Sequence, residues 1–114
     1  MSVPLYQAKA ELFRTLGHPV RIRVLELLQD GPKPVRDLLA DIDVEASNLS
    51  QQLAVLRRAG LVTSSRDGAL VVYALGSAEV AALLAAARGI LSEVLADRDG
   101  LRAQLRDDGT AVRA

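Results

Sequence analysis

A row of small, amide-bearing and basic side chains lies along the segment from Val44 to Gly60. In a helix, with about 100° between successive residues, one face of this segment carries an almost straight row: Ser47, Gln51, Ala54 and Arg58. The opposite face carries leucines at positions 49, 53 and 56. Amide groups donate and accept hydrogen bonds and arginine only donates, so the row suits DNA base edges and the phosphates beside them. The alternative is an ordinary solvated helix surface, which the segment alone does not exclude.

The charges of the chain are balanced in total and clustered in sequence. Fourteen basic and fourteen acidic residues give a net charge of zero, which considered alone argues against DNA binding. Basic residues outnumber acidic ones between residues 9 and 36, and further arginines follow at Arg57, Arg58 and Arg66. An acidic run separates the two basic groups: Asp37, Asp41, Asp43 and Glu45. The sequence therefore predicts a patterned surface, with positive charge near the polar row.

The composition excludes several kinds of chemistry. The chain has no cysteine, and therefore no disulfide, thiolate nucleophile or thiolate metal site. Its one histidine, His18, cannot form a zinc site alone, and we expect it to have a structural role at a helix start. No set of nucleophile, base and orienting group can be assembled, so no enzyme is expected. No apolar run reaches the roughly 20 residues of a membrane span and no signal-peptide pattern opens the chain, so a cytoplasmic protein is expected.

Two helices are predicted before residue 30. Apolar residues at helical spacing predict a first helix over residues 5–16, and Gly17 is expected to end it in a left-handed conformation. Pro19 suits the first turn of a second helix, where its missing N–H has no consequence, and this helix is expected to continue to Leu28.

A third, short helix and the polar-faced helix are expected next. The third helix begins at Pro34 and carries a set of apolar residues: Val35, Leu38, Leu39 and Ile42. The start of the polar-faced helix stays open between two N-caps, Asp43 and Ser47. A helix, a tight connection and a second helix with a solvent-exposed polar face predict a helix-turn-helix.

After Gly60 the period of apolar residues changes from that of a helix to that of a strand. The segments 61–66 and 70–75 are predicted strands around Asp67-Gly68, a dipeptide preferred in two-residue hairpin turns because both central positions need positive φ. A helix-turn-helix followed directly by a hairpin is a winged helix. Arg66 beside the turn can touch a phosphate or enter a minor groove, although an arginine at a hairpin tip is often only solvated.

A long final helix is predicted after Ser77, which suits its N-cap. Its apolar stripe is interrupted at Arg98 and otherwise follows alternating steps of four and three: Val80, Leu84, Ala87, Leu91, Val94, Leu101 and Leu105. The apolar surface of such a helix is larger than the core of one small domain can bury. A second copy of the same helix is the simplest cover and predicts a homodimer, while the alternative is a helix that folds back on its own domain.

Three stretches of the chain resemble the ArsR/SmtB transcriptional repressors. Residues 16–25 (LGHPVRIRVL) resemble the family's opening segment, residues 47–62 (SNLSQQLAVLRRAGLV) its recognition helix, and residues 66–68 with Val72-Tyr73 its wing. The resemblance implies a mainly α winged helix-turn-helix with one small β-hairpin, in the order ααααββα, which dimerises through its first and last helices. It also implies repression from a palindromic operator, with recognition helices roughly 34 Å apart, and relief of repression by a signal.

The resemblance also indicates residues for contact with double-stranded DNA. The family's DNA-contacting positions fall on the polar-faced helix: Ser47, Asn48, Ser50 and Gln51, with Gln52 close by. We expect Arg57, Arg58 and Arg66 to anchor phosphates. A Ser47 committed to capping would leave Asn48 and Gln51 as the better candidates for base contacts.

The sensor positions depart from the family pattern. Many members bind metal or arsenic through two cysteines in the third helix, and the matching segment here, residues 34–38 (PVRDL), has no thiol. Other members bind zinc with Asp and His on the final helix, where this chain has Glu93, Asp97 and Asp99 without a histidine, so a solvated acidic face is expected. We therefore predict no metal and no cofactor. A small molecule, bound for example between the long helices of a dimer, or another protein would supply the signal.

The sequence thus predicts one winged helix-turn-helix domain over residues 1–106 and a disordered tail over residues 107–114. The predicted function is that of a homodimeric, sequence-specific DNA-binding repressor released by a non-thiol signal. A winged-helix module that binds proteins instead of DNA is the alternative, because a fold does not fix a function and the net charge is zero.

Overall fold

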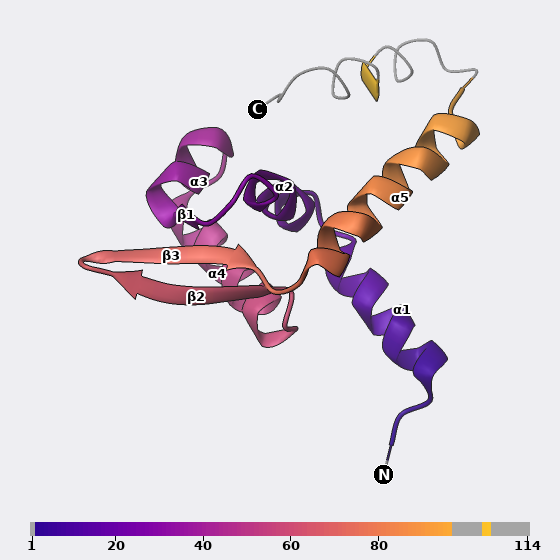
Figure 1. The fold of residues 1–114 in the computed structure, drawn as a ribbon, viewed down its shortest axis with the longest axis horizontal. Helices are drawn as coiled ribbons and strands as arrows, with labels where there is room; N and C mark the ends of the chain where they lie inside the picture. The colour runs from indigo at the N-terminus through magenta and orange to yellow at the C-terminus, as the bar shows by residue number, and fades with distance from the viewer. Residues whose placement is uncertain (1, 97–103, 106–114) are drawn as a thin grey trace.

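A computed structural model of the chain describes residues 2–96 and 104–105 (Figure 1). The elements follow in chain order: α1 (Leu5–Leu16), α2 (Pro19–Leu28), β1 (Lys33–Pro34), α3 (Val35–Asp41), α4 (Ala46–Arg58), β2 (Val62–Asp67), β3 (Leu70–Leu75) and α5 (Ala78–Val94). The predicted mainly α winged helix-turn-helix is confirmed, with one strand more than the sequence indicated. The predicted tail, residues 107–114, lies outside the described residues.

The junction between α1 and α2 depends on three consecutive residues. His18 is the N-cap of α2, and its Nδ1 accepts a hydrogen bond from the backbone N–H of Val20 at 3.2 Å. Pro19 occupies the first helical position, as predicted. The expected structural role of His18 is therefore confirmed. The expected left-handed Gly17 is wrong: α1 ends at Leu16, but Gly17 has a φ of −77°.

The core is aliphatic and lies where α2, α3 and α4 pack together. Its fully buried side chains come mostly from these helices: Val24, Leu25, Leu38, Leu49, Leu53, Leu56 and Val62. Burial of one such side chain contributes roughly 1.5–3 kcal/mol relative to leaving it in water. The predicted leucine face of α4 is thus confirmed as the inner face of that helix.

The sheet has three strands in the order β1-β3-β2, all antiparallel. The sequence predicted the β2–β3 hairpin and missed β1, whose two residues pair with the middle of β3: Lys33 lies opposite Tyr73 and Pro34 opposite Val72. Pro34 was expected to begin a helix. It closes the edge strand, where a missing N–H is tolerated, and is also the N-cap of α3.

The hairpin turn lies one residue later than the sequence predicted. Asp67 pairs with Leu70, so the two-residue loop consists of Gly68 and Ala69. Gly68 has a φ of 65°, and within the described residues no residue other than glycine has a positive φ. A glycine with positive φ at the first central position, without a second one, is the type II′ pattern. Asp67 therefore belongs to β2 and only one central position needs a positive φ.

Helix α4 and the hairpin are joined through a close backbone contact. The helix ends in a Schellman motif: Gly60, with a φ of 79°, donates to the Arg57 carbonyl and Leu61 donates to the Leu56 carbonyl, both at 3.0 Å. Gly76, at the far end of β3, then donates to the Leu61 carbonyl at 2.9 Å. A Cβ on Gly76 would lie 2.4 Å from the Gly60 oxygen, so this approach needs glycine.

The last helix is shorter than the sequence predicted. Ser77 is its N-cap by position, without a side-chain capping bond, and α5 ends at Val94. The guanidinium of Arg88 donates to the carbonyl of Leu105. In one continuous helix these two residues would be about 25 Å apart. The expected helix from Ser77 to Leu105 is therefore wrong, and the expected stripe positions Arg98 and Leu101 lie outside the described residues.

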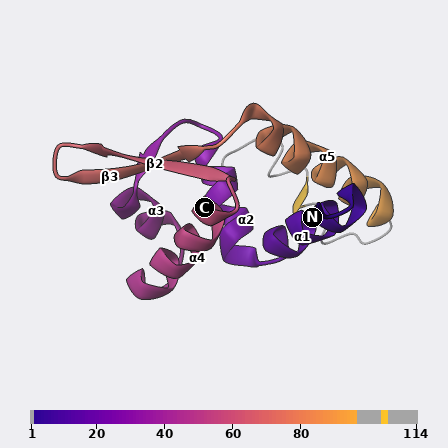
Figure 2. The ribbon, with the colours of Figure 1, turned by 90° about the horizontal axis from the view of Figure 1, so that it is seen from below.

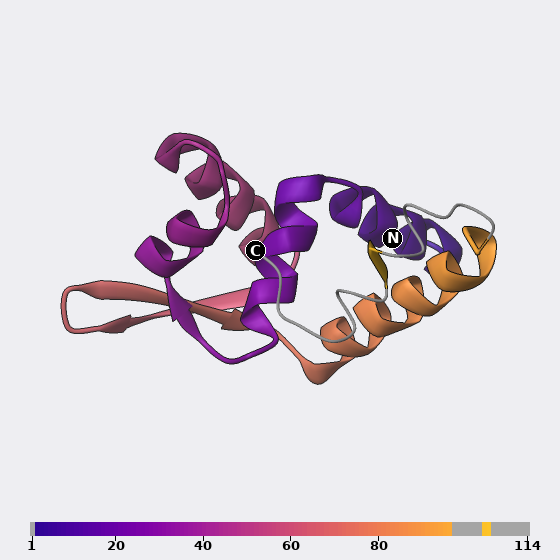
Figure 3. The ribbon, with the colours of Figure 1, turned by 90° about the horizontal axis from the view of Figure 1, so that it is seen from above.

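The molecule has two distinct ends. The hairpin and α4 lie at one end, and α1 and α5 lie at the other, in both views turned from that of Figure 1 (Figures 2 and 3). In Figure 1 the two terminal helices diverge from the body like the arms of a V. This arrangement separates the surface that carries the polar row from the surface that carries most exposed apolar side chains.

Candidate nucleic-acid interface

The outer face of α4 carries three exposed polar residues of the predicted set, Ser47, Ser50 and Gln51. The helix begins at Ala46 after Glu45 as N-cap, and no side chain forms a capping hydrogen bond there. Neither Asp43 nor Ser47 is therefore the cap, and the Ser47 hydroxyl is not committed to one. The sequence left open whether Ser47 is the N-cap of this helix; in the structure it is not, and its hydroxyl is available at the surface.

Asn48 and Gln52 occupy the boundary between this face and the interior. Asn48 is half-buried, while Gln52 is only 9% exposed. The Gln52 Oε1 accepts from Arg21 Nε at 2.7 Å, and the Gln52 Nε2 donates to Asn48 Oδ1 at 3.0 Å. The sequence predicted Gln52 at the DNA-contacting surface. The structure places it inside the domain instead, because its amide satisfies an arginine that comes from α2.

Arg21 extends this arrangement to α1. Its Nη1 donates to the backbone carbonyl of Thr15 at 3.0 Å, so one guanidinium joins α1, α2 and α4. Arg21 belongs to the basic residues between positions 9 and 36, and the sequence pattern does not indicate this role. No local sequence pattern could indicate this contact, because Arg21 and Gln52 are 31 residues apart in the chain.

The predicted phosphate anchors are exposed at the same end of the molecule as α4. Arg57 and Arg58 form the last turn of α4, and Arg66 lies in β2, one residue pair before the end of the hairpin ladder. Within residues 2–96 and 104–105, none of the three forms an ion pair. Cations at a helix C-terminus interact favourably with the helix dipole, so Arg57 and Arg58 also stabilise the last turn of α4.

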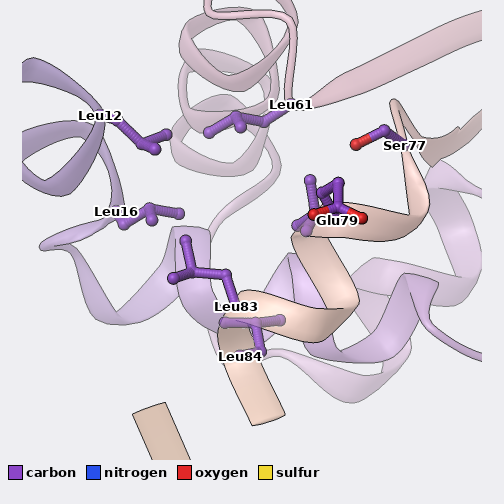
Figure 4. Close-up of a pocket in the computed structure, with 8 residues that line it drawn as sticks. Leu12, Leu16, Leu61, Ser77, Glu79, Leu83 and Leu84 are labelled. Atoms are coloured by element: carbon purple, nitrogen blue, oxygen red, sulfur yellow. The ribbon is translucent and has the colours of Figure 1, made fainter. Parts of the chain in front are cut away.

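The terminal helices border a mostly apolar cavity of about 360 Å³ (Figure 4). Leucines of α1 and α5 face each other across it, with Ser77 and Glu79 as the polar residues of the lining: Leu12, Leu16, Leu61, Ser77, Glu79, Val80, Leu83 and Leu84. The cavity lies near the vertex of the V, away from the polar face of α4. It shares no residue with the predicted DNA-contacting set.

No cluster of three or more His, Cys, Asp or Glu side chains that could hold a metal ion occurs in the described part of the chain. Asp97 and Asp99, which the sequence analysis considered beside Glu93, lie outside it. Among the same described residues, no helix is long and apolar enough to cross a membrane.

Comparison with known proteins assigns this arrangement to a family. Residues 18–64, from the α2 cap into β2, match the model of the bacterial regulatory proteins of the arsR family. An uncharacterized HTH-type transcriptional regulator of Mycobacterium tuberculosis, Rv0081, is 51% identical over 112 residues, which cover 97% of this chain and 98% of that protein. Its crystal structure superposes with a TM-score of 0.78 at 54% identity over 85% of this chain and 98% of that one.

Two further solved structures are similar. The transcriptional repressor BigR of Xylella fastidiosa has a TM-score of 0.68 and 35% identity, over 78% of this chain and 87% of that chain. A homodimeric winged helix-turn-helix DNA-binding domain of Mb0332 from Mycobacterium bovis has a TM-score of 0.72 and 26% identity, over 80% of this chain and 84% of that chain. Rv0081 and BigR are both named as transcriptional regulators. The family match and the relative that aligns over almost its whole length show that the chain belongs to the ArsR family of winged helix-turn-helix transcriptional regulators.

Proposed function

We propose that the protein is a homodimeric repressor that binds a palindromic operator through α4. The domain expected over residues 1–106 would supply one half of the dimer. In this proposal α4 enters the major groove and arginines at its end anchor phosphates. The base edges are contacted by four residues: Ser47, Asn48, Ser50 and Gln51. The observation that carries it is the exposed polar face of α4, which adjoins two arginines without ion-pair partners among the described residues.

The homodimer is supported by the exposed apolar side chains on and beside α1 and α5. Large apolar side chains that remain at least about 45% exposed gather there: Val3, Leu5, Tyr6, Phe13, Ile90, Leu91 and Val94. Large apolar side chains exposed together at one end of a small domain are typical of an interaction site. Mb0332, of similar fold, is described as homodimeric. A two-fold dimer through these helices presents two copies of α4, which fits a palindromic operator with half-sites roughly 34 Å apart.

Repression and its relief belong to the same proposal. BigR, at 35% identity, is named a transcriptional repressor, which supports repression over activation. Since the chain has no cysteine, the signal that releases the protein from DNA cannot act through a thiol. The cavity beside the terminal helices is large enough for a small organic molecule.

Binding to the promoter region of the protein's own gene tests the proposal. We expect a clear preference over scrambled DNA of equal length, measured by fluorescence anisotropy, and binding that is unchanged by EDTA. Three arginines in each protomer give six phosphate contacts per dimer, so log K should fall with log salt with a slope of roughly −5. Equal affinity for promoter and scrambled DNA would contradict the proposal and favour the protein-binding module.

Two substitutions separate the roles within the interface. Arg58→Ala should weaken binding to all sequences about equally and reduce the salt slope by roughly 2 in the dimer. Gln51→Ala should instead reduce the preference for the operator, by about 1–3 kcal/mol per half-site. Arg14→Ala is the matched control, because Arg14 lies on α1 at the opposite end and pairs with Glu11. Sedimentation should show an intact dimer for every variant.

A further inference from the structure

We infer that Arg21 and Gln52 fix the orientation of the Asn48 side-chain amide, so that its oxygen faces Gln52 and its N–H groups are the part offered to DNA. Gln52 is then a positioning residue that determines which base Asn48 selects without touching DNA itself. The inference rests on the proposed function, because it assumes that α4 enters the major groove. It goes further in stating which hydrogen-bonding groups of the DNA one position of the helix can recognise.

The orientation begins with Arg21. A guanidinium has only donors, so the group of Gln52 that faces Arg21 Nε at 2.7 Å must be its oxygen. Arg21 cannot turn away easily, because its Nη1 is held by the Thr15 carbonyl at 3.0 Å. Gln52 is 9% exposed, so water offers its amide little alternative. A flipped Gln52 would direct an NH₂ group at a guanidinium in the interior, and one of the two would lose its partner.

The orientation then passes to Asn48. With its oxygen committed to Arg21, Gln52 has only its NH₂ group for Asn48, one helical turn earlier, and this group donates to Asn48 Oδ1 at 3.0 Å. The Asn48 oxygen is thereby turned toward Gln52, and only its second lone pair remains as an acceptor. The Asn48 Nδ2 has no protein acceptor within the described residues, and it is not buried, because no buried side-chain nitrogen or oxygen in this part of the chain lacks a partner. Asn48 therefore presents its two N–H groups at the surface.

This orientation limits what Asn48 can read. In the major groove, acceptors are presented by guanine N7 and O6, thymine O4 and adenine N7, whereas donors are presented by cytosine N4 and adenine N6. The usual pairing of asparagine with adenine is bidentate and needs the asparagine oxygen as well as its nitrogen. Here the oxygen is held toward Gln52, so the oxygen and the nitrogen of Asn48 cannot both face the same base edge. Asn48 should therefore select guanine or thymine, and adenine should gain at most one hydrogen bond.

Gln52→Glu is the substitution that reverses this orientation. One carboxylate oxygen can still accept from Arg21 Nε, while the other replaces the NH₂ group with an acceptor. Asn48 must then turn its own NH₂ group toward the new carboxylate and present its oxygen to the DNA. We expect the preferred base at the Asn48 position to change from guanine or thymine to cytosine or adenine, with a shift in relative preference of about tenfold.

The experiment is a selection of operators from random half-sites by the full-length wild-type and variant proteins, followed by affinity measurements. Asn48→Ala identifies the position concerned, because it should flatten the preference at one base pair in each half-site. Gln29→Glu is the matched control, since it adds the same charge at an exposed position outside the DNA-contacting set and should leave the Asn48 position unchanged. Circular dichroism and sedimentation check that each variant is folded and dimeric.

The outcomes distinguish the two proposals. If the wild-type protein selects no sequence, the proposed function fails. If it selects an operator but Gln52→Glu selects the same base at the Asn48 position, only the inference is overturned. Amide hydrogen exchange by NMR on the wild-type protein gives an independent test if Gln52→Glu does not fold. The Gln52 NH₂ protons should exchange at least about tenfold more slowly than those of Asn48 and Gln51, and equal rates would overturn the inference.

Discussion

At the scale of single residues, the domain depends on one buried polar contact between helices that are distant in sequence. Gln52 is the only buried polar or charged side chain among the described residues, and Arg21 satisfies its oxygen. No buried side-chain polar atom in this part of the chain lacks a hydrogen-bond partner. Removal of one partner is therefore more costly than removal of both, because it leaves a buried acceptor unsatisfied.

Arg21→Met tests this coupling. The substitution keeps an unbranched chain but leaves Gln52 Oε1 without a donor, so we expect a loss of roughly 1–3 kcal/mol in the free energy of unfolding. The double variant Arg21→Met with Gln52→Met should be more stable than Arg21→Met alone, because both polar partners are then removed. Urea denaturation at one fixed protein concentration measures the free energy of unfolding of each variant. Strictly additive effects of the two substitutions would contradict the coupling.

Residues whose environment follows from periodicity were predictable from the sequence, and residues with distant partners were not. Leu49, Leu53 and Leu56 recur at helical spacing, and all three are buried as expected. The cap at His18 was indicated by the proline that follows it. Gln52 carries no such signal, because a polar residue at the edge of an apolar stripe is ordinarily exposed. Only a partner on α2, which folding brings near, places its amide in the interior.

At the scale of elements, the contact between the ends of α4 and β3 fixes the wing relative to the recognition helix. Gly76 has no positive φ, so its glycine is required by close approach to the Gly60 carbonyl and not by backbone conformation. Gly89 in α5 is the opposite case, since a Cβ there would meet nothing within 4 Å. The two glycines therefore form a natural pair for comparison.

Gly76→Ala should destabilise the protein and Gly89→Ala should not. The new methyl group at position 76 would force the backbone apart, for which we expect a loss of about 1–3 kcal/mol. Alanine at position 89 removes a poor helix former from the middle of α5 and should gain up to about 1 kcal/mol. Thermal denaturation followed by circular dichroism compares the variants with wild type at equal concentration. A neutral Gly76→Ala would show that the α4–β3 junction can relax.

Elements with a strong local periodicity were predicted from the sequence, whereas strand β1 and the exact position of the hairpin turn were not. The period of apolar residues identified all five helices and the β2–β3 hairpin. Strand β1 is two residues long and exists only through its pairing with β3, so it has no periodicity to detect. The turn was displaced by one residue because register depends on all pairs of the ladder, from Val62–Leu75 onward, and not on the dipeptide alone.

At the scale of the whole molecule, the two ends have different chemistry, and the proposed dimer would use both. The apolar end, formed by α1 and α5, would join two protomers, and the polar end would then be presented twice. Linking two binding sites in this way raises the affinity for a two-site operator by roughly 10²–10⁴ over that for a half-site. DNA binding by the monomer should consequently be weak.

A charge placed in the apolar end should therefore strongly weaken operator binding, although it changes no residue of α4. Phe13 is 57% exposed and Val94 is 70% exposed in the single chain. We expect Phe13→Asp and Val94→Asp to sediment as folded monomers, because an isolated carboxylate is costly to bury in an interface. Operator affinity should fall at least about 100-fold. Phe13→Leu is the matched control and should remain dimeric; monomeric variants with wild-type affinity would exclude this surface as the dimer interface.

The positions of the two tyrosines make the two ends optically distinct. The chain has no tryptophan, so its intrinsic fluorescence is dominated by Tyr6 and Tyr73. Tyr6 is 72% exposed at the apolar end, whereas Tyr73 is half-buried in the central strand, opposite Ser64 of the wing. Single Tyr→Phe variants would leave one tyrosine emitter each. The unlabelled protein thus carries one intrinsic fluorophore for association between subunits and another for engagement of the wing.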